Sequence, residues 1–191
     1  MRLIVLALSI VLLASCSSQD NALQPDPRFR TLSIELLQGL PDSEVENAIE
    51  EHVLHKIGSD WEREPQIVRA LPPGVQMVYT TSWLEAEVNN GGFNQYFWNS
   101  SGELANEALA GLVMIGAADH STLLEEAIEI RKREEQTMQE LERKGTEEAF
   151  VESYKLTALN DLDQRFYGLE QDLSKLRVAY IRANPGSFVS Q

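Results

Sequence analysis

A run of amides and carboxylates between residues 85 and 103 is the part of this sequence best suited to bind a polar ligand. Two glycines, Gly91 and Gly92, lie at its centre, and the aromatic residues Phe93 and Tyr96-Phe97-Trp98 follow them. A pocket for a peptide or a small polar ligand would use the hydrogen-bonding side chains on both sides of these glycines, namely Glu85, Glu87, Asn89, Asn90, Gln95 and Asn99.

The same residues also fit a purely structural role, which we favour. Glycines permit a sharp turn with positive φ between two helices, and Gly91 and Gly92 are both candidates for that conformation. Asparagine side chains bond to loop backbone and cap helix ends, and the aromatic residues would anchor the turn in a hydrophobic core. The ligand pocket remains the alternative interpretation.

Residues of the types that catalyse reactions or bind metals are present, but their spacing does not favour either role. His52 and His55 could face a metal from one side of a helix, yet no third ligand is evident, so we expect a pair of surface histidines. The later His120 completes no Ser-His-Asp arrangement that the sequence supports. Asp161 and Asp163 point to different sides of a helix and are poor candidates for shared acid–base work. We therefore expect no enzyme, no metal and no cofactor.

The single cysteine, Cys16, has a chemical role that its context predicts. The preceding residues, Leu13-Ala14-Ser15, and Cys16 together resemble the lipobox of bacterial lipoproteins, in which a diacylglyceryl group is attached to the cysteine sulfur. The apolar run from Leu3 to Ala14 is too short to span a bilayer of about 30 Å and fits the hydrophobic region of a secretory signal. An ordinary signal peptide with an incidental cysteine is the alternative.

This interpretation divides the N-terminus into a signal peptide over residues 1–15 and a lipidated tether over residues 16–27. The acyl chains would hold the protein on a membrane. By resemblance to known lipoproteins, Ser17 after the cysteine indicates the outer membrane of the bacterial envelope, facing the periplasm.

The remaining residues, 28–191, predict a single compact all-α domain. A hydrophobic fraction of 43% excludes a disordered chain. Apolar residues recur at helical spacing and nowhere alternate for long. We expect helices over residues 29–37, 43–57, 75–88, 93–98, 102–115 and 121–144, and a last helical region from Thr146 onwards.

Capping residues predict where these helices begin and end. Ser43 and Glu46 form a capping box, Ser121 and one of Ser100 and Ser101 are further N-caps, and glycines at 58, 116 and 145 end helices. Apolar residues from Leu159 to Tyr180 recur at alternating steps of three and four. This stripe predicts a helix pair in the core, with a dimeric coiled coil, and hence a homodimer, as the alternative.

The chain is strongly acidic, and its charge is unevenly distributed. It contains 16 Lys and Arg against 30 Asp and Glu, for a formal net charge of −14. No Lys or Arg occurs from Ala70 to Ile130, whereas residues 131–191 mix both signs. An acidic surface repels nucleic-acid phosphates, so we expect no nucleic-acid partner. It favours association with a basic protein, although a surface that serves solubility alone is the alternative.

Several motifs resemble those of the DNA-mimic-protein-like family, a bacterial all-α domain family of unknown function. The central one comprises Val88 to Phe93, Gln95 to Phe97 and Asn99 to Gly102. Further matches are Ala108-Leu109, Ile115-Gly116-Ala117, Leu162 to Tyr167 and Tyr180 to Pro185. The resemblance covers roughly residues 30 to 190 and implies a compact helical domain.

Two hypotheses about function follow from these observations. The first is a membrane-anchored, non-catalytic helical module that presents an acidic face to a protein partner. The second is a small-ligand receptor or an enzyme whose site is the Asn-Asn-Gly-Gly segment, residues 89–92.

Overall fold

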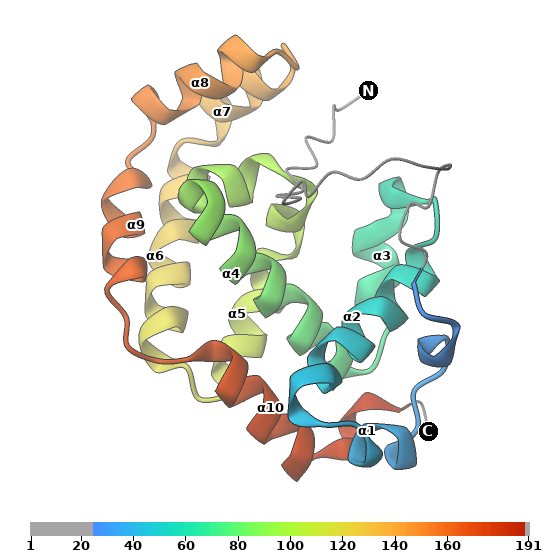
Figure 1. Cartoon of the computed structure of the whole chain (residues 1–191). Coiled ribbons are helices and arrows are strands. Elements are labelled where there is room, and N and C mark those ends of the chain that lie inside the picture. Colours follow the sequence, from blue (N-terminus) through green and yellow to red (C-terminus); the bar gives the residue numbers. More distant parts are fainter. Residues whose placement is uncertain (1–24, 190–191) are drawn as a thin grey trace, which may run out of the picture.

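The computed structural model describes residues 25–189, which are predominantly helical and contain no strand (Figure 1). The predicted all-α, single-domain fold is therefore confirmed. The α-helices are α1 (Ile34–Gly39), α2 (Asp42–Ile57), α3 (Glu64–Arg69), α4 (Pro73–Trp98), α5 (Ala105–Met114), α6 (Ala118–Arg133), α7 (Glu135–Glu142), α8 (Glu147–Leu156), α9 (Asn160–Tyr167) and α10 (Leu173–Ala183), and the short 3₁₀ helices are η1 (Pro27–Phe29), η2 (Trp61–Arg63), η3 (Ser100–Leu104) and η4 (Pro185–Phe188).

Helix α4 is the central element, and it packs against α2, α5, α9 and α10 (Figure 1). Pro73 begins it, at a position where a helix needs no backbone N–H donor, and Pro72 before it is extended. Val75, Leu84 and Val88 are fully buried along its length. Because α4 contacts helices from both halves of the chain, residues distant in sequence meet on its surface.

The helices α7 and α8 form a hairpin that projects at the top of Figure 1. A small apolar cluster separate from the main core holds it together, made of Met138, Leu141 and Ala149, with Trp98 packed against them. The rings of Trp98 and Phe150 lie 5.1 Å apart between centroids. The C-terminal end of α4 therefore attaches this hairpin to the rest of the molecule.

Three of the predicted helix ends are confirmed by backbone conformation. Gly58, Gly116 and Gly145 have φ of 58°, 75° and 62°, in the left-handed region that follows many helix C-termini. Each comes directly after, or within three residues of, the end of α2, α5 or α7.

The predicted helix starts are wrong where they rested on serine caps. Helix α2 begins at Asp42 with Pro41 as its N-cap, so Ser43 lies inside the helix and no capping box forms. Ser121 lies in the first turn of α6, where its hydroxyl donates to the carbonyl of Ala118. Ser100 and Ser101 do not cap α5 but belong to η3, which precedes it.

Three of the predicted helical segments are divided. In the segment over residues 29–37, η1 ends at Phe29, residues 30–33 are not helical, and α1 begins at Ile34. The segment over residues 121–144 breaks at Glu134 into α6 and α7. The stripe from Leu159 to Tyr180 is shared between α9 and α10 and packs into the main core, in agreement with a core helix pair. The ordered structure was expected to end at residues 184–186, but it continues beyond them. The helix η4 follows and buries Phe188 against Gly74.

The predicted signal peptide, Cys16 and most of the tether lie outside the described residues. Within residues 25–189, no helix is both long enough and apolar enough to cross a membrane.

Candidate functional site

The two central glycines produce a kink inside α4 and not a loop between separate helices. Asn89 and Asn90 remain helical before the kink, which lies at Gly91 and Gly92. Gly92 has a φ of 74°, whereas Gly91 has a φ of −153°. The prediction of positive φ therefore holds for Gly92 and is wrong for Gly91.

Asp163 on α9 caps the helical segment that restarts after the kink. The backbone N–H of Phe93 donates to Asp163 Oδ1 over 2.9 Å, and a Cβ atom on Gly92 would overlap the same carboxylate. Burial raises the pKa of Asp163, and the bond from Phe93 partly opposes this. Glycine is thus required at position 92 both by the backbone conformation and by the approach of Asp163.

Two tyrosines bind the other side of the kink. The Tyr154 hydroxyl on α8 donates to the carbonyl of Gly91, and the Tyr167 hydroxyl on α9 donates to the carbonyl of Val88, both over 2.8 Å. Burial raises the pKa of both tyrosines, so they remain protonated donors at neutral pH. Backbone carbonyls beside a helix break need partners of this kind.

The predicted ligand-binding side chains do not converge on one open site. Gln95 Nε2 and Asn99 Nδ2 donate to Glu87 Oε2 over 2.6 and 2.9 Å, so these three side chains bind one another. Asn89 and Asn90 are exposed and make no side-chain hydrogen bond among the described residues. Glu85 faces α10, and the buried Asn94, which was not predicted, donates to Ser153 over 2.8 Å.

A cavity of about 790 Å³ lies beyond the C-terminal end of α4. Of the predicted residues, Asn99 is the one that lines it. Lys132, Arg143 and Glu135 from the α6–α7 region also line it, and this mixture of charges gives no preference for a ligand of one sign.

A second polar cluster, which the sequence did not predict, lies where α2, α4 and α10 meet. Arg177 on α10 is 4% exposed. Its Nε donates to Glu46 Oε1, and its Nη2 donates to Glu85 Oε2 over 2.8 Å. Ser174 donates to the other oxygen of Glu46 over 2.5 Å. We call Glu46, Glu50, Glu85 and Arg177 the Arg177 cluster.

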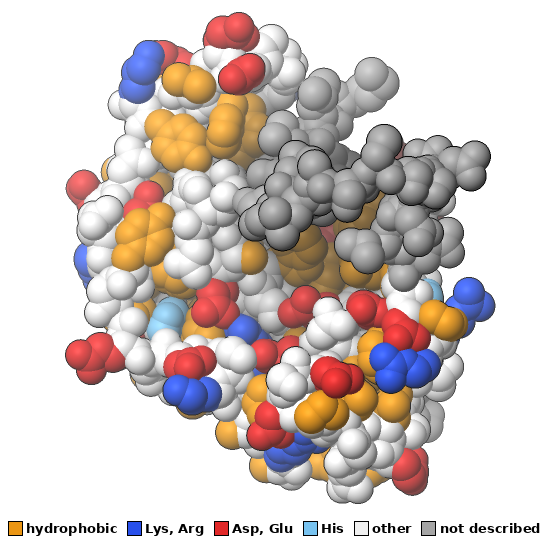
Figure 2. Space-filling view, in the orientation of Figure 1, with side chains coloured by type: hydrophobic (Ala, Val, Ile, Leu, Met, Phe, Trp, Pro, Cys, Tyr) orange, Lys and Arg blue, Asp and Glu red, His pale blue; other side chains and the backbone are white. Residues whose placement is uncertain are grey.

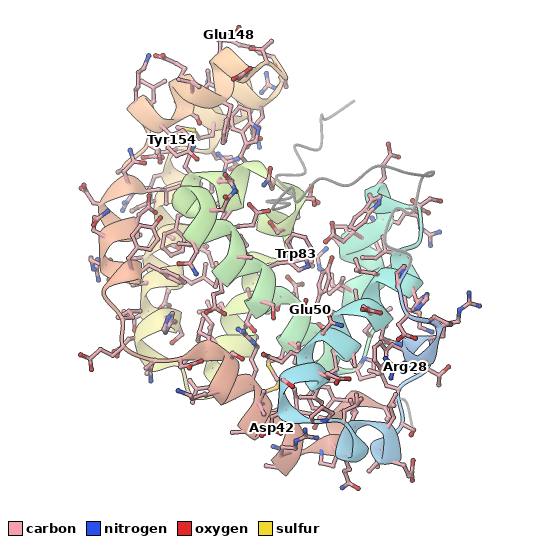
Figure 3. The ribbon with its side chains drawn as sticks, in the orientation of Figure 1. Arg28, Asp42, Glu50, Trp83, Glu148 and Tyr154 are labelled. Carbon is pink, nitrogen blue, oxygen red and sulfur yellow. The ribbon has the colours of Figure 1, made fainter. Side chains whose placement is uncertain are left out.

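Glu50 is the third carboxylate of this cluster. Figure 3 shows it on α2, on the side that faces α4. Burial raises the pKa of Glu50, Ser82 and Arg177 lower it, and the neighbouring Glu46 and Glu85 raise it further. Ser82 Oγ lies close enough to act on Glu50, but it makes no hydrogen bond of normal geometry. Glu50 is therefore a carboxylate without a cation of its own.

Several buried polar atoms beside the Arg177 cluster lack a hydrogen bond of normal geometry, although Ser82 acts on Glu50 and Gln171 on His120 at close range. Arg177 Nη1, Ser82 Oγ, Gln171 Oε1 and His120 Nδ1 all lack a hydrogen bond of normal geometry among the described residues. Burial lowers the pKa of His120, while Gln171 and the charge of Glu85 raise it, which places His120 beside the cluster. Buried groups of this kind are rare because each costs about 1–3 kcal/mol when unpaired.

The sequence contained one signal that could have revealed this cluster. Leu173, Arg177 and Ile181 are the buried residues of α10 and recur at steps of four. A charged residue on the buried face of a helix needs buried partners. The partners themselves, 131 and 92 residues earlier in the chain, could not be identified without the fold.

The histidine pair has a structural role. His52 Nδ1 lies 3.0 Å from the carbonyl of Phe29, and His55 Nε2 lies 2.8 Å from the carbonyl of Asp26. The prediction of two surface histidines is wrong for His52, which is 7% exposed. No group of His, Cys, Asp and Glu within residues 25–189 is placed to hold a metal ion.

The acidic region between residues 70 and 130 receives cations from elsewhere in the chain. Arg69 pairs with Glu107, Arg165 with Glu126, and Arg177 with Glu85. On α6, however, Asp119, Glu125 and Glu129 are exposed and make no ion pair with any described residue. The excess of negative charge is thus partly neutralised in three dimensions and partly left on α6.

The fold and these contacts define an all-α protein built around a kinked central helix that side chains from α8 and α9 hold in place. The family model described as DMP19-like protein matches residues 69–184, which include the kink, its three partners and Arg177. The chain belongs to this family. Comparisons with curated proteins and with solved structures gave no match.

Proposed function

We propose that this protein is a non-catalytic binding module of the bacterial envelope that engages a basic protein partner. Lipid attached to Cys16 would anchor it to the outer membrane, facing the periplasm. Each buried CH₂ group of the acyl chains contributes about 0.8 kcal/mol to such an anchor.

The exposed carboxylates of α6 are the observation that carries the proposal. Glu125 and Glu129 lie one helical turn apart and therefore share a face. Neither makes an ion pair with a described residue, and the nearby Arg165 is already bound to Glu126 through two hydrogen bonds. Unpaired acids at fixed spacing attract a basic surface and accelerate its association.

The second hypothesis, a ligand site at residues 89–92, has less support. Glu87 already accepts hydrogen bonds from Gln95 and Asn99. The kink itself is occupied by contacts from Asp163, Tyr154 and Tyr167. These contacts account for the polar residues of the segment without a ligand.

The test compares charge reversals at two places on the surface. Glu125→Lys with Glu129→Lys reverses the exposed acids of α6. The matched control, Glu140→Lys with Glu170→Lys, reverses two exposed acids in the C-terminal region where charges are mixed. Glu107 is unsuitable for this purpose because it pairs with Arg69, and its reversal would damage the fold.

Crosslinking and affinity capture from membranes, at low and high salt, would identify proteins that bind the parent. We expect a basic protein whose capture falls with salt, because exposed charges are screened over about 8 Å at physiological ionic strength. The α6 variant should no longer capture this basic protein, and the control variant should still capture it. With the purified partner, association rates that do not change across a salt series, or equal losses in both variants, would contradict the proposal.

A further inference from the structure

The Arg177 cluster carries more negative than positive charge. It contains the carboxylates of Glu46, Glu50 and Glu85 and the guanidinium of Arg177. Both oxygens of Glu46 are bound, by Arg177 and Ser174. Glu85 uses Oε2 for Arg177, and no described donor bonds to its Oε1. The carboxylate of Glu50 and one oxygen of Glu85 therefore remain available to a cation.

The same cluster presents a donor that nothing satisfies. Arg177 is 4% exposed, and its Nη1 has no acceptor among the described residues although Nε and Nη2 are both bound. Ser82 Oγ, which lies close enough to lower the pKa of Glu50, also lacks a hydrogen bond of normal geometry. A cluster of acids alone would indicate a solvated surface, but a buried guanidinium with an open donor indicates that an acceptor belongs there.

Two carboxylates of the cluster are partly exposed, whereas its guanidinium is buried. The side chain of Glu85 is 33% exposed and that of Glu46 is 18% exposed, whereas that of Arg177 is 5% exposed. Figure 2 shows acidic side chains gathered around a basic one in the middle of the face that it presents. In Figure 3, Glu50 and Trp83 lie on this same face, between α2 and α4.

We propose that the Arg177 cluster binds a small organic cation, a molecule with a primary ammonium or guanidinium group next to a carbonyl oxygen. The cationic group would pair with Glu50 and with Oε1 of Glu85. Arg177 Nη1, which is covered in this structure, would donate to the carbonyl oxygen after a side-chain movement that uncovers it. This site is separate from the acidic face of α6 and does not rest on the function proposed above.

The composition of the cluster favours this class of ligand over others. An anion would be repelled by three carboxylates at short range. A metal ion is not favoured, because no described group of His, Cys, Asp and Glu has the arrangement of a metal site. A neutral ligand could satisfy Arg177 but would leave Glu50 without a counter-charge, which is costly for a partly buried carboxylate.

The probes are blocked amino acids added to the purified full-length protein in detergent, with binding measured by isothermal titration calorimetry. N-acetyl-arginine amide and N-acetyl-lysine amide carry the cation and the carbonyl, and N-acetyl-glutamine amide is the neutral control. We expect saturable binding of at least one cationic probe, with a dissociation constant in about the micromolar to millimolar range, and none of the neutral probe.

Glu50→Gln tests the site itself, because it removes the charge while keeping the shape. We expect cation binding at least about tenfold weaker in this variant. The matched control is Glu44→Gln, which removes an equal charge from an exposed position on the same helix and should leave binding unchanged. No saturable binding of either cation, equal binding of the neutral probe, or equal effects of both variants would overturn the proposal.

A pH series on the parent protein provides an independent test that does not require the variant to fold. The groups that act on Glu50 are Glu46 on its own helix, Tyr79, Ser82 and Glu85 on α4, and Arg177 on α10, and His120 on α6 lies beside Glu85 and Arg177. Because burial raises the pKa of Glu50, cation affinity should fall as the pH decreases through that value. Affinity that stays constant between about pH 4 and 8 would overturn the proposal.

Discussion

Gly92→Ala measures how strongly the kink in α4 depends on glycine. A side chain at a φ of 74° is strained by about 1–2 kcal/mol. The new Cβ would also overlap the carboxylate of Asp163, which must move and release the N–H of Phe93. Losing such a helix cap costs about 1 kcal/mol, and more if the N–H remains buried. We expect Gly92→Ala to lower the free energy of unfolding by about 3 kcal/mol.

Gly116→Ala is the matched control for this measurement. Gly116 has a nearly identical φ of 75°, but no atom lies within 4 Å of the position that its Cβ would take. It should therefore show the backbone strain alone, about 1–2 kcal/mol. Urea denaturation of both variants gives the two free energies directly. Equal losses would refute the argument, since they would mean that Asp163 moves away from Gly92 without cost.

A double-mutant cycle assigns the difference between the two variants to Asp163. In an Asp163→Ala background the carboxylate is absent, so Gly92→Ala should cost about as much as Gly116→Ala. The coupling energy between positions 92 and 163 is expected to be about 1–2 kcal/mol. A coupling near zero would assign the excess loss in Gly92→Ala to some other contact.

Cys16→Ala should release the protein from the membrane fraction or leave it as a precursor, and unchanged labelling with radioactive palmitate would contradict the lipid anchor. Arg177→Met should destabilise the fold by about 3–5 kcal/mol in urea denaturation, because it leaves the carboxylates of Glu46 and Glu85 without their shared cation. Glu50→Gln should raise the melting temperature near pH 7. Burial raises the folded pKa of Glu50, so its charge lowers stability above that pKa, and the gain should disappear as the pH falls through it.

Much of the fold could be predicted from the sequence because it depends on local patterns. Apolar spacing indicated an all-α domain, and glycines marked the ends of α2, α5 and α7 and the kink in α4. Serine caps were predicted less well. Pro41 fixes the start of α2, and the Ser43 side chain inside the helix caps nothing. A preference for serine at N-caps is weaker than the backbone restriction that proline imposes.

The candidate sites could be predicted only in part, because their contacts join distant segments. The sequence identified Gly92 as a turn residue, but its partner Asp163 lies 70 residues from Phe93 and was expected to have no special role. Asn89 and Asn90 were candidates for a ligand pocket because of their residue type, yet both are exposed. Arg177 was not among the candidates selected from the sequence, although a charged residue on the buried face of an amphipathic helix indicates buried partners.

The uneven charge of the chain is partly explained by how its two ends meet. Three arginines of the C-terminal helices bind acids of the preceding region: Arg165 binds Glu126, Arg177 binds Glu46 and Glu85, and Arg182 binds Asp42. These ion pairs contribute to the docking of α9 and α10, so the acids involved are accounted for by the fold. Carboxylates that the fold leaves unpaired, on α6 and at Glu50, have no such explanation. An unpaired, partly buried carboxylate such as Glu50 lowers stability. A bound cation would offset this loss, so Glu50 is the residue whose presence the proposed ligand explains best.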